Sequence, residues 1–426
     1  MAIQKFAAVA GAVMVLTAAC SSSTPTPAPT TAPTAVASTA PSAAAASAAP
    51  SAAAANLTPA SFDASFSAMA QPKSVYAAGK GSIAVILPDT TSSSRYTAYD
   101  QPYLKQAFDA AGFSSSDYSI QNAAGTTTTE LALAQAAITA GAKVLVVDPI
   151  DSTTGNQIQA AAAQAGIPMI SYDRATFQGT KTYYVSFDNV QVGKLIGQGF
   201  MQCVTDWGVK SPKVFTLDGG QDTDPNAIDF AKGYNSVVWG QSVAQVKAGT
   251  TNSQGMTLVD EQLAPGWDNA KGGTIFQQAY TAHPEINATI EANDGLAGAV
   301  ITALKAAGVP AKKIPTTGQD GTLQGMEYVL QGWQCGSVYK PIYIEAQAAV
   351  ALATYLRAGQ TPPAALLNGS TTDPKNSATT EPALLLTPMW VNAANMEATV
   401  IKDKFISVSD LCTAVGQSVC TAAGIQ

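Results

Sequence analysis

The chain has 426 residues, of which 46% are hydrophobic and 12% carry a formal charge. This length accommodates two α/β domains of ordinary size, about 100–200 residues each, together with additional segments. The formal net charge is −7 and no cluster of Lys and Arg occurs, so neither nucleic acid nor an anionic membrane surface is an expected partner.

The N-terminus has the plan of a secretion signal. Lys5 is followed by an apolar run from Phe6 to Leu16 and by small residues up to Cys20, and this run is too short for a permanent transmembrane helix. We therefore predict a signal peptide at residues 1–19. The segment before Cys20 resembles the lipobox of bacterial lipoproteins, in which this cysteine carries the lipid after cleavage, although Thr17 stands where an aliphatic residue is usual. Ordinary cleavage nearby is the alternative.

A low-complexity segment follows the signal. Residues 21–55 consist almost entirely of Ser, Thr, Pro and Ala, which offer too little bulky apolar surface to offset the entropy of ordering them. We therefore predict a lipidated tether at residues 20–56 that holds a soluble part of the chain off a membrane. Residues 57–81 are interpreted as a partly helical N-terminal extension.

The four remaining cysteines are an even number in a chain expected to be exported, where thiols tend to be oxidised. They allow three connectivities, of which we favour Cys412–Cys420, close in sequence, together with Cys203–Cys335 as a long-range bridge. No C-x-x-C pair occurs and His283 is the only histidine, so we expect no metal site and no cofactor.

From Ser82 onward, short β-branched runs alternate with Ala-rich segments of helical length, a pattern typical of βαβ units and a parallel sheet. The first set of expected strands is Ile83–Leu87, Tyr118–Gln121, Val144–Val147, Pro168–Ser171 and Tyr183–Phe187. The second set is Val214–Leu217, Val243–Lys247, Thr289–Glu291, Ile314–Thr317 and Ser337–Tyr339. The similarity of Ala161–Pro168 to Ala303–Pro310 favours two equivalent α/β lobes, each a doubly wound parallel sheet.

Ligands of parallel sheets collect beyond the carboxyl ends of the strands, and the residues at those positions here are polar. They are Asp148, Asp173, Arg174, Asp218, Asp224, Asn226, Asn293, Asp294, Asp320 and Lys340. Such a mixture of guanidinium, carboxylate and amide groups suits a neutral polyol, and Tyr96 and Trp267 could pack on the C–H faces of a sugar ring. The alternatives are helix N-caps at Asp218 and Asp294, a surface ion pair for Arg174 and an exposed edge for Lys340.

A set of motifs lies across these two groups of strands. They are Tyr172–Arg174, Tyr184–Gly193, Gly219–Gly220 with Asp224–Ala227, Gly266–Trp267, Asn293–Asp294 with Ala297–Gly298, Gly318–Asp320, Val338–Ile342, and Leu385–Pro388 through Val400–Asp403. In these motifs, residues 82–405 resemble the sugar-binding proteins of bacterial importers in the ribose-binding class, most closely its D-xylose-binding members.

The resemblance implies the fold of a type I periplasmic binding protein, with two lobes joined by a three-crossover hinge. The crossovers would lie near Ser186–Asp188, Lys340–Pro341 and Pro388–Val391. The N-terminal lobe would comprise residues 82–187 and 341–389, and the C-terminal lobe residues 188–340 and 390–426. The lobes would close on a monosaccharide, D-xylose before other sugars, and the closed monomer would deliver it to the permease of an ABC importer.

The resemblance also implies the roles of individual residues. Those expected to hydrogen-bond the sugar are Arg95, Arg174, Asn226, Asn293, Asp320 and Lys340, with Asp224 as a further candidate. Trp267 is expected to stack on the sugar, and Tyr96 is a second stacking candidate. The protein would act on the outer face of the cytoplasmic membrane, at the cell surface or in the periplasm.

Three other functions are weighed against transport. A sugar-responsive repressor shares the expected fold but begins with a basic helix-turn-helix, whereas this chain begins with a signal and a tether. An enzyme is not expected, since the chain has one histidine, no G-x-S-x-G elbow and no P-loop. Binding of another pentose or hexose, or presentation of the sugar to a membrane receptor as a sensor, stays open.

Overall fold

The computed structural model describes residues 57–426 except 91, 92, 94, 180 and 221, and these belong to one compact unit. The predicted signal peptide, Cys20 and the tether lie outside the described residues. Within the described part of the chain, no helix combines the length and the hydropathy that a membrane crossing requires.

The N-terminal lobe is built on a seven-stranded sheet in the order β11-β12-β5-β4-β3-β1-β2. Its strands are β1 (Ile83–Leu87), β2 (Tyr118–Asn122), β3 (Val144–Val147), β4 (Met169–Tyr172), β5 (Thr182–Phe187), β11 (Gly369–Asp373) and β12 (Asn376–Leu386). Neighbouring strands are parallel except in the β11–β12 hairpin. All five strands of the first predicted set are present, and the hairpin extends the sheet at its edge.

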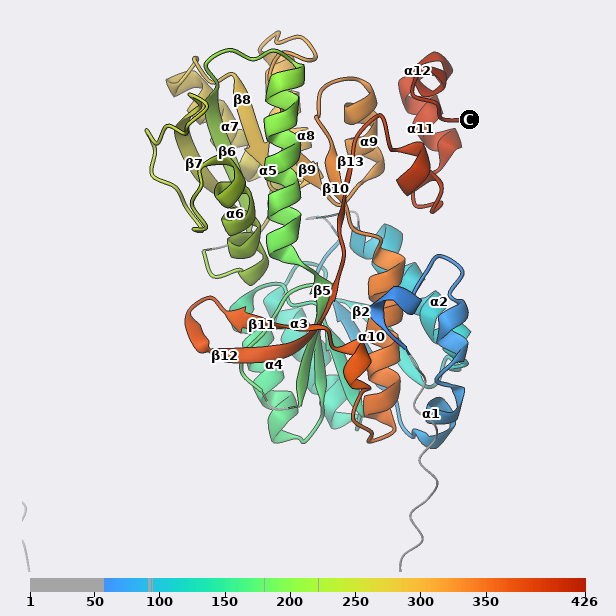
Figure 1. The fold of residues 1–426 in the computed structure, drawn as a ribbon. Helices are drawn as coiled ribbons and strands as arrows, with labels where there is room; N and C mark the ends of the chain where they lie inside the picture. Colours follow the sequence, from blue (N-terminus) through green and yellow to red (C-terminus); the bar gives the residue numbers. More distant parts are fainter. Residues whose placement is uncertain (1–56, 91–92, 94, 180, 221) are drawn as a thin grey trace, which may run out of the picture. The chain divides into compact units, whose positions relative to one another are not determined.

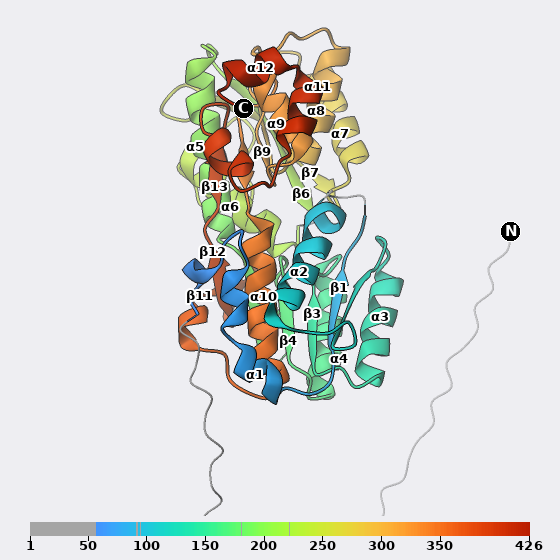
Figure 2. The same ribbon diagram turned by 90° about the vertical axis from the view of Figure 1, so that its right-hand side faces the viewer.

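Helices cover both faces of this sheet because successive side chains of a strand point to opposite faces. In β1, Ile83, Val85 and Leu87 belong to the core beneath α2 (Gln101–Ala111) and α10 (Ile342–Arg357). Ala84 and Ile86 belong to the core beneath α3 (Thr127–Thr139) and α4 (Ser152–Gln164). Figure 2 shows the two helical layers on either side of the strands. The lobe is therefore doubly wound, as predicted.

The N-terminal extension is part of this lobe. It forms η1 (Pro59–Ser61), η2 (Ser67–Ala70) and α1 (Lys73–Ala78). Its apolar side chains Leu57, Phe66 and Val75 are buried in the same core as α10. Gln347 of α10 donates to the carbonyl of Asp63 at 2.8 Å. The extension thus completes the helical layer over the sheet.

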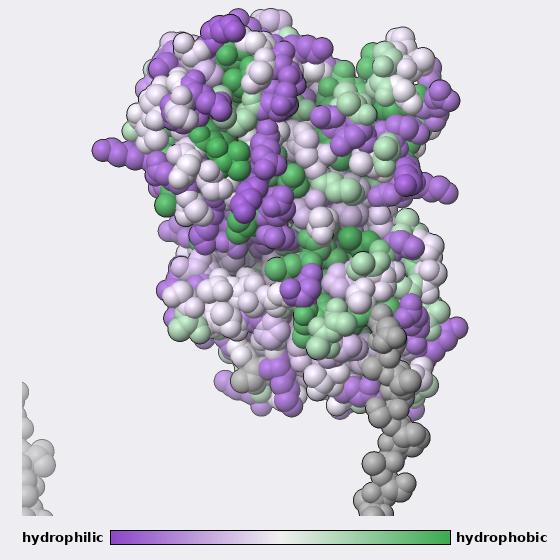
Figure 3. Space-filling view, in the orientation of Figure 1, coloured by the Kyte–Doolittle hydropathy of each residue, from purple (hydrophilic) through white to green (hydrophobic). Residues whose placement is uncertain are grey.

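The C-terminal lobe contains two three-stranded sheets in place of one continuous sheet. Parallel strands β7 (Thr257–Pro265), β6 (Lys213–Gly220) and β8 (Ala288–Glu291) form one, and β13 (Met389–Val391), β10 (Ser337–Tyr339) and β9 (Gly318–Gln319) form the other. Helices α5 (Asn189–Asp206) and α6 (Pro225–Val238) lie in front of these strands in Figure 1, and α7 (Asn269–Ala282) and α8 (Asp294–Ala306) lie behind them. Figure 3 shows hydrophilic side chains gathered along the outer face of α5.

Shorter elements complete the chain. They are η3 (Tyr96–Asp100), α9 (Leu323–Leu330), η4 (Ala364–Leu366), η5 (Glu397–Ile401), α11 (Val408–Val415) and α12 (Gln417–Ala422). The last two helices lie beside α9 on the C-terminal lobe, where Figures 1 and 2 agree in placing them.

Two predicted strands of the C-terminal lobe are wrong. Val243–Lys247 has no regular structure, and the strand that pairs with β6 is Thr257–Pro265. Ile314–Thr317 lies beside β8 but pairs with it largely through side chains, since Thr317 donates its backbone N–H to the Glu291 carboxylate. Its side-chain hydroxyl in turn bonds the backbone of Glu291. This side-chain pairing interrupts the backbone ladder and separates the two sheets.

The chain passes between the lobes three times. The crossovers are Asp188 between β5 and α5, Lys340–Pro341 between β10 and α10, and residues 387–388 between β12 and β13. They agree with the three expected positions. The exact domain boundaries stay a prediction.

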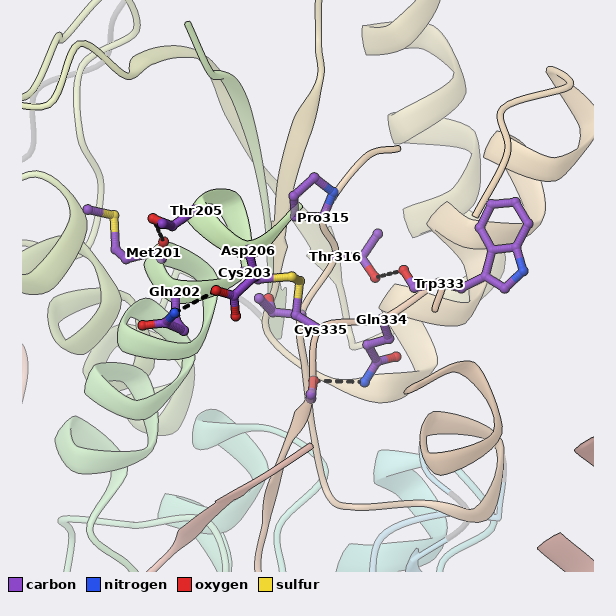
Figure 4. Close-up of a disulfide and its surroundings, with 12 residues drawn as sticks. Met201, Gln202, Cys203, Thr205, Asp206, Pro315, Thr316, Trp333, Gln334 and Cys335 are labelled. Carbon is purple, nitrogen blue, oxygen red and sulfur yellow. Dashed lines mark hydrogen bonds between the residues drawn. A yellow bond between two sulfur atoms is a disulfide. The ribbon is translucent and has the colours of Figure 1, made fainter. Parts of the chain in front are cut away.

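Both favoured disulfides are present. Cys203 of α5 is bonded to Cys335, just before β10, and Figure 4 shows this bridge within the C-terminal lobe. Cys412 is bonded to Cys420 between α11 and α12. The first bridge therefore ties together the elements that adjoin two of the three crossovers.

Candidate functional site

A cavity with about 340 Å³ of space between its atoms, part of it open to solvent, lies where strand ends of both lobes meet. Its lining residues are Ser93, Arg95, Tyr96, Asp173, Arg174, Asn226, Phe230, Trp267, Asn293, Gln319, Asp320 and Lys340. Eight of the nine residues predicted to bind ligand line this cavity. Asp224 does not.

The lining follows from the parallel topology. Arg174 lies just beyond β4, Asn293 beyond β8, Asp320 directly after β9 and Lys340 directly after β10. Because parallel strands all end at the same edge of their sheet, residues distant in sequence converge there. The crossovers then bring the strand ends of the two lobes face to face.

Arg95 lines the cavity and takes part in a buried charge network. Its guanidinium donates to Asp100 at 2.8 and 2.9 Å, to Asp173 at 2.8 Å and to Glu345 at 2.8 Å. These contacts use four of its five N–H groups. One N–H on Nη1 remains for the predicted hydrogen bond of Arg95 to a ligand, and that role stays a prediction.

Arg174 and Tyr96 form a second unit on the N-terminal lobe. Arg174 Nη2 donates to the Tyr96 hydroxyl at 2.8 Å, and Arg174 Nη1 donates to the carbonyl of Pro149 at 2.9 Å. Both Arg95 and Arg174 lie within 5.7 Å of the centre of the Tyr96 ring. The two cations thus hold the ring as part of the cavity wall. Arg174 is buried and is not a surface ion-pair partner.

The cations of the cavity face carboxylates. Lys340 Nζ lies 3.2 Å from Asp320 and 3.8 Å from Asp173. Burial alone would raise the pKa of Asp173, but Arg95, Lys340 and Arg174 outweigh it and hold that pKa at about 2. Behind the wall, burial raises the pKa of Asp148 well above its usual value. Arg95 and Lys340 are thus each paired with carboxylates, whereas the ion-pair partner of Arg174 among the described residues is Asp148, 3.9 Å away. Lys340 is buried and is not an exposed edge residue.

The C-terminal lobe supplies amide groups. Asn226 Nδ2 donates to the carbonyl of Asp173 at 2.8 Å, which joins the two lobes directly. Asn293 Oδ1 caps α8 by accepting from Leu296 N, and Gln319 Nε2 donates to the carbonyl of Ala292. Gln319 Oε1 is buried and has no hydrogen-bond partner within the described chain, so it is an acceptor suited to a ligand hydroxyl.

Aromatic rings from both lobes bound the cavity. Trp267 lies beyond β7 and is packed edge-on by Phe230 of α6, with ring centres 6.2 Å apart. Tyr96 forms part of the opposing N-terminal lobe. Trp267 is buried to the same extent as Trp239, which lies outside the cavity. Trp267 is nevertheless one of the cavity residues.

Three lining residues have left-handed backbone conformations. The φ angles are +58° at Asp173, +59° at Trp267 and +94° at Asp320. Such conformations cost a non-glycine residue on the order of 1–3 kcal/mol and cluster at functional sites. Their concentration around one cavity marks it as the candidate site on grounds independent of its chemistry.

Four lining residues were not among the predicted ligand-binding residues, although Asp173 was noted at a strand end. Gln319 lies next to Asp320 at a strand end, and Phe230 follows Asn226 by one helical turn, so strand-end position and i, i+4 spacing could have indicated these two residues. Ser93 contacts Asp320 at 3.4 Å from a Ser/Thr-rich loop with no distinguishing pattern.

Two neighbouring acids have structural roles. Asp218 hydrogen-bonds the hydroxyl of Tyr234 and caps no helix. Asp294 accepts from Thr322, Gln334 and Ser337, and burial raises its pKa to about 7. The cap of α8 is Asn293 rather than Asp294. Within the described residues, no group of three or more His, Cys, Asp or Glu side chains could hold a metal ion.

Comparison with known proteins agrees with this architecture. Residues 83–361 match the model of the family described as periplasmic binding protein domain. The chain belongs to the periplasmic binding protein family. It is 32% identical over 294 residues to the D-xylose-binding periplasmic protein of Escherichia coli (strain K12), which covers 68% of this chain and 82% of that protein. It is 29% identical over 345 residues to the multiple sugar-binding periplasmic receptor ChvE of Rhizobium radiobacter, covering 79% and 94%.

Solved structures share the fold of this periplasmic binding protein. An ABC transporter solute-binding protein from Clostridium phytofermentans with bound β-D-glucose superposes with a TM-score of 0.65 at 23% identity, covering 77% of this chain and 99% of that chain. The Caulobacter myo-inositol binding protein gives a TM-score of 0.61 at 18% identity, covering 77% and 99%. Type I architecture with two α/β lobes is thereby established.

Proposed function

We propose that the protein binds one neutral monosaccharide in the cavity and encloses it by closure of the two lobes. The observation that carries this proposal is the pairing of charge around the cavity: Lys340 faces Asp320, and Arg95 faces Asp173. An anionic ligand would meet these carboxylates at short range, whereas a neutral ligand leaves each ion pair intact. The hydroxyls of a sugar can still donate to the carboxylates and accept from the cations.

The shape of the site supports the same ligand class. Trp267 and Tyr96 offer flat apolar surfaces, and apart from Phe230 the other lining residues are polar. A sugar ring presents apolar C–H faces and polar edges, so it matches this arrangement. The two lobes touch directly: Ser93 contacts Asp320, and Ser152 donates to the carbonyl of Thr223 at 2.8 Å. Such contacts between lobes are expected of a closed state.

D-xylose is the first candidate sugar. The support is the similarity to the D-xylose-binding periplasmic proteins of Escherichia coli and Haemophilus influenzae, 32% and 31% identical to this chain. Another pentose or a hexose is the alternative, because two further relatives are named as multiple sugar-binding proteins. The direct hydrogen-bonding groups of the proposal are Arg174, Asn226, Asn293, Asp320 and Lys340.

We further propose that the protein is exported, anchored through Cys20 on the outer face of the cytoplasmic membrane, and delivers its sugar as a monomer to the permease of an ABC importer. It would bind the sugar without converting it. Presentation to a membrane receptor as a sensor is the alternative. Loss of sugar uptake in cells lacking the protein supports transport, whereas intact uptake with a lost transcriptional or motility response supports sensing.

The ligand itself can be identified by mass spectrometry. The protein is purified without dialysis against denaturant and sprayed under native conditions, and any retained molecule is released and identified. We expect a species with the mass of a pentose, bound one to one. A phosphorylated or amino-acid ligand in the same position contradicts the proposal.

A further inference from the structure

The indole of Trp267 is fixed by groups other than the cavity itself. Its Nε1–H donates to Asp224 Oδ2 at 2.9 Å. Asp224 lies at the N-terminus of α6 and is not among the residues that line the cavity. The indole of Trp267 is therefore held by a residue outside the cavity lining.

Two glycines at the end of β6 make room for the ring. A Cβ atom at Gly219 would lie 1.9 Å from Cε3 of Trp267, and one at Gly220 would lie 2.9 Å from its Nε1. Carbon atoms do not approach so closely, so any side chain at Gly219 must displace the indole. The ring thus rests directly on bare backbone.

Asp224 divides its two carboxylate oxygens between two tasks. Oδ1 accepts from the backbone N–H of Asn226 at 3.0 Å and of Ala227 at 3.4 Å, which caps α6. Oδ2 accepts only from the indole among the contacts described. Because α6 also carries Asn226 and Phe230, one carboxylate sets the position of the helix and the orientation of the ring together.

We propose that Asp224 and Gly219 are positioning residues, which hold the indole of Trp267 flat on β6 so that its free face forms a rigid wall for the ring of a sugar. This inference rests on the proposed function and assigns Asp224 a place behind the stacking surface instead of the direct contact expected from sequence. A ring held on three sides by Gly219, Asp224 and Phe230 presents one fixed plane, which favours a flat pyranose over a branched or acyclic polyol.

The test separates the cap from the indole contact. Asp224→Ser keeps a capping oxygen but cannot reach the indole. Asp151→Ser is the control, because Asp151 caps α4 in the same way, accepting from Thr154 N at 2.7 Å, and lies outside the cavity. We expect Asp224→Ser to weaken xylose binding about 3- to 10-fold in calorimetry, and Asp151→Ser to leave it unchanged. Equal effects of the two variants overturn the proposal.

A double mutant shows whether Asp224 acts through the ring. In a Trp267→Phe background the indole N–H is absent, so Asp224→Ser should cause no further loss. A loss as large as in the wild-type background means that Asp224 touches the sugar directly, and this overturns the proposal. Gly219→Ala should weaken binding by about tenfold or more. Gly273→Ala on α7, where a Cβ meets Ala299 at 3.4 Å, is its control.

A fluorescence measurement distinguishes failure of this inference from failure of the proposed function. The emission of Trp267 is obtained as the difference between the wild type and Trp267→Phe, and its quenching by acrylamide is measured without any sugar. Asp224→Ser should make Trp267 more accessible to the quencher. Unchanged quenching overturns the positioning role. If the wild type binds no monosaccharide yet quenching rises, the proposed function fails while the positioning of the ring stands.

Discussion

Asn226 of the C-terminal lobe donates a hydrogen bond to the backbone carbonyl of Asp173 in the N-terminal lobe, at 2.8 Å. The hydroxyl of Tyr184 contacts the same carbonyl at 2.7 Å and Asn226 Oδ1 at 3.1 Å, and Asn189 donates to both Tyr184 and Asn226. These residues are buried beside the crossover at Asp188. This buried polar network joins the two lobes, and on the proposed function it would be complete only in the closed state.

Removal of the Tyr184 hydroxyl should therefore destabilise the closed state. We expect Tyr184→Phe to release ligand roughly 3- to 10-fold faster with little change in the association rate, since the loss falls on the closed complex. Stopped-flow fluorescence measures both rates. Tyr183→Phe is the matched control, because the neighbouring residue is only half-buried and lies outside the cavity. Equal dissociation rates for the wild type and Tyr184→Phe would exclude the network from closure.

The stacking role of Trp267 predicts a loss of affinity on truncation. Trp267→Ala should weaken sugar binding by about 1–3 kcal/mol, the scale of a buried aromatic contact. Trp333→Ala, in the same lobe but outside the cavity, should bind normally. Calorimetry at fixed temperature compares the two. Unchanged affinity of Trp267→Ala removes Trp267 from the site.

The two disulfides should contribute unequally to stability. They close loops with sequence separations of 132 and 8 residues. In the chain-entropy account, the Cys203–Cys335 bridge raises the free energy of the unfolded chain by about 5 kcal/mol and the Cys412–Cys420 bridge raises it by about 2.5 kcal/mol. Replacing Cys203 and Cys335 by Ser should thus lower the midpoint of thermal unfolding more than replacing Cys412 and Cys420. The reverse order would show that native-state contacts around the short bridge dominate.

The raised pKa of the buried Glu381 predicts that the stability of the protein depends on pH. Burial raises the pKa of this side chain to about 8, although Thr182 and Gln159 act to lower it, whereas an unfolded glutamate titrates near about 4.3. Between these values the unfolded chain gives up a proton that the folded chain keeps. The contribution of Glu381 to stability is therefore full below the unfolded pKa and is lost as the pH rises towards 8.

Glu381→Gln should remove the part of the pH-dependent loss of stability that comes from Glu381. Urea unfolding at pH 5 and pH 8.5 should show that the decline in unfolding free energy between the two pH values is smaller in the variant, by roughly 1–3 kcal/mol. The exposed Glu397 provides the control, since Glu397→Gln should decline as the wild type does. An identical decline in Glu381→Gln and the wild type would contradict the raised pKa.

The sequence predicted strands well where apolar side chains are continuous. Ile83–Leu87 and Val144–Val147 are buried throughout and have the predicted bounds. Thr257–Pro265 was missed because its outward side chains include Asp260 and Gln262, which hide the apolar pattern. Val243–Lys247 contains two valines three residues apart, but only Val246 is buried, and the backbone N–H of Val246 donates to the Glu261 side chain instead of a neighbouring strand.

The candidate site was predicted in position but not in detail. The strand-end rule brought Arg174, Asn293 and Lys340 to one cavity because it depends only on parallel topology. The partners of Arg95 could not be predicted, since Asp173 and Glu345 are 78 and 250 residues away in sequence. Which groups face the ligand and which hold other groups in place is a property of the packed structure.

Titration calorimetry with a panel of monosaccharides tests the central claim most directly. The protein, freed of retained ligand by mild unfolding and refolding, is titrated with D-xylose, D-ribose and D-glucose, with the cyclitol myo-inositol, and with a sugar phosphate and an amino acid as charged comparisons. We predict saturable one-to-one binding of a neutral monosaccharide, with D-xylose the tightest of the panel. No heat with any neutral sugar, together with binding of a charged solute, would contradict the account.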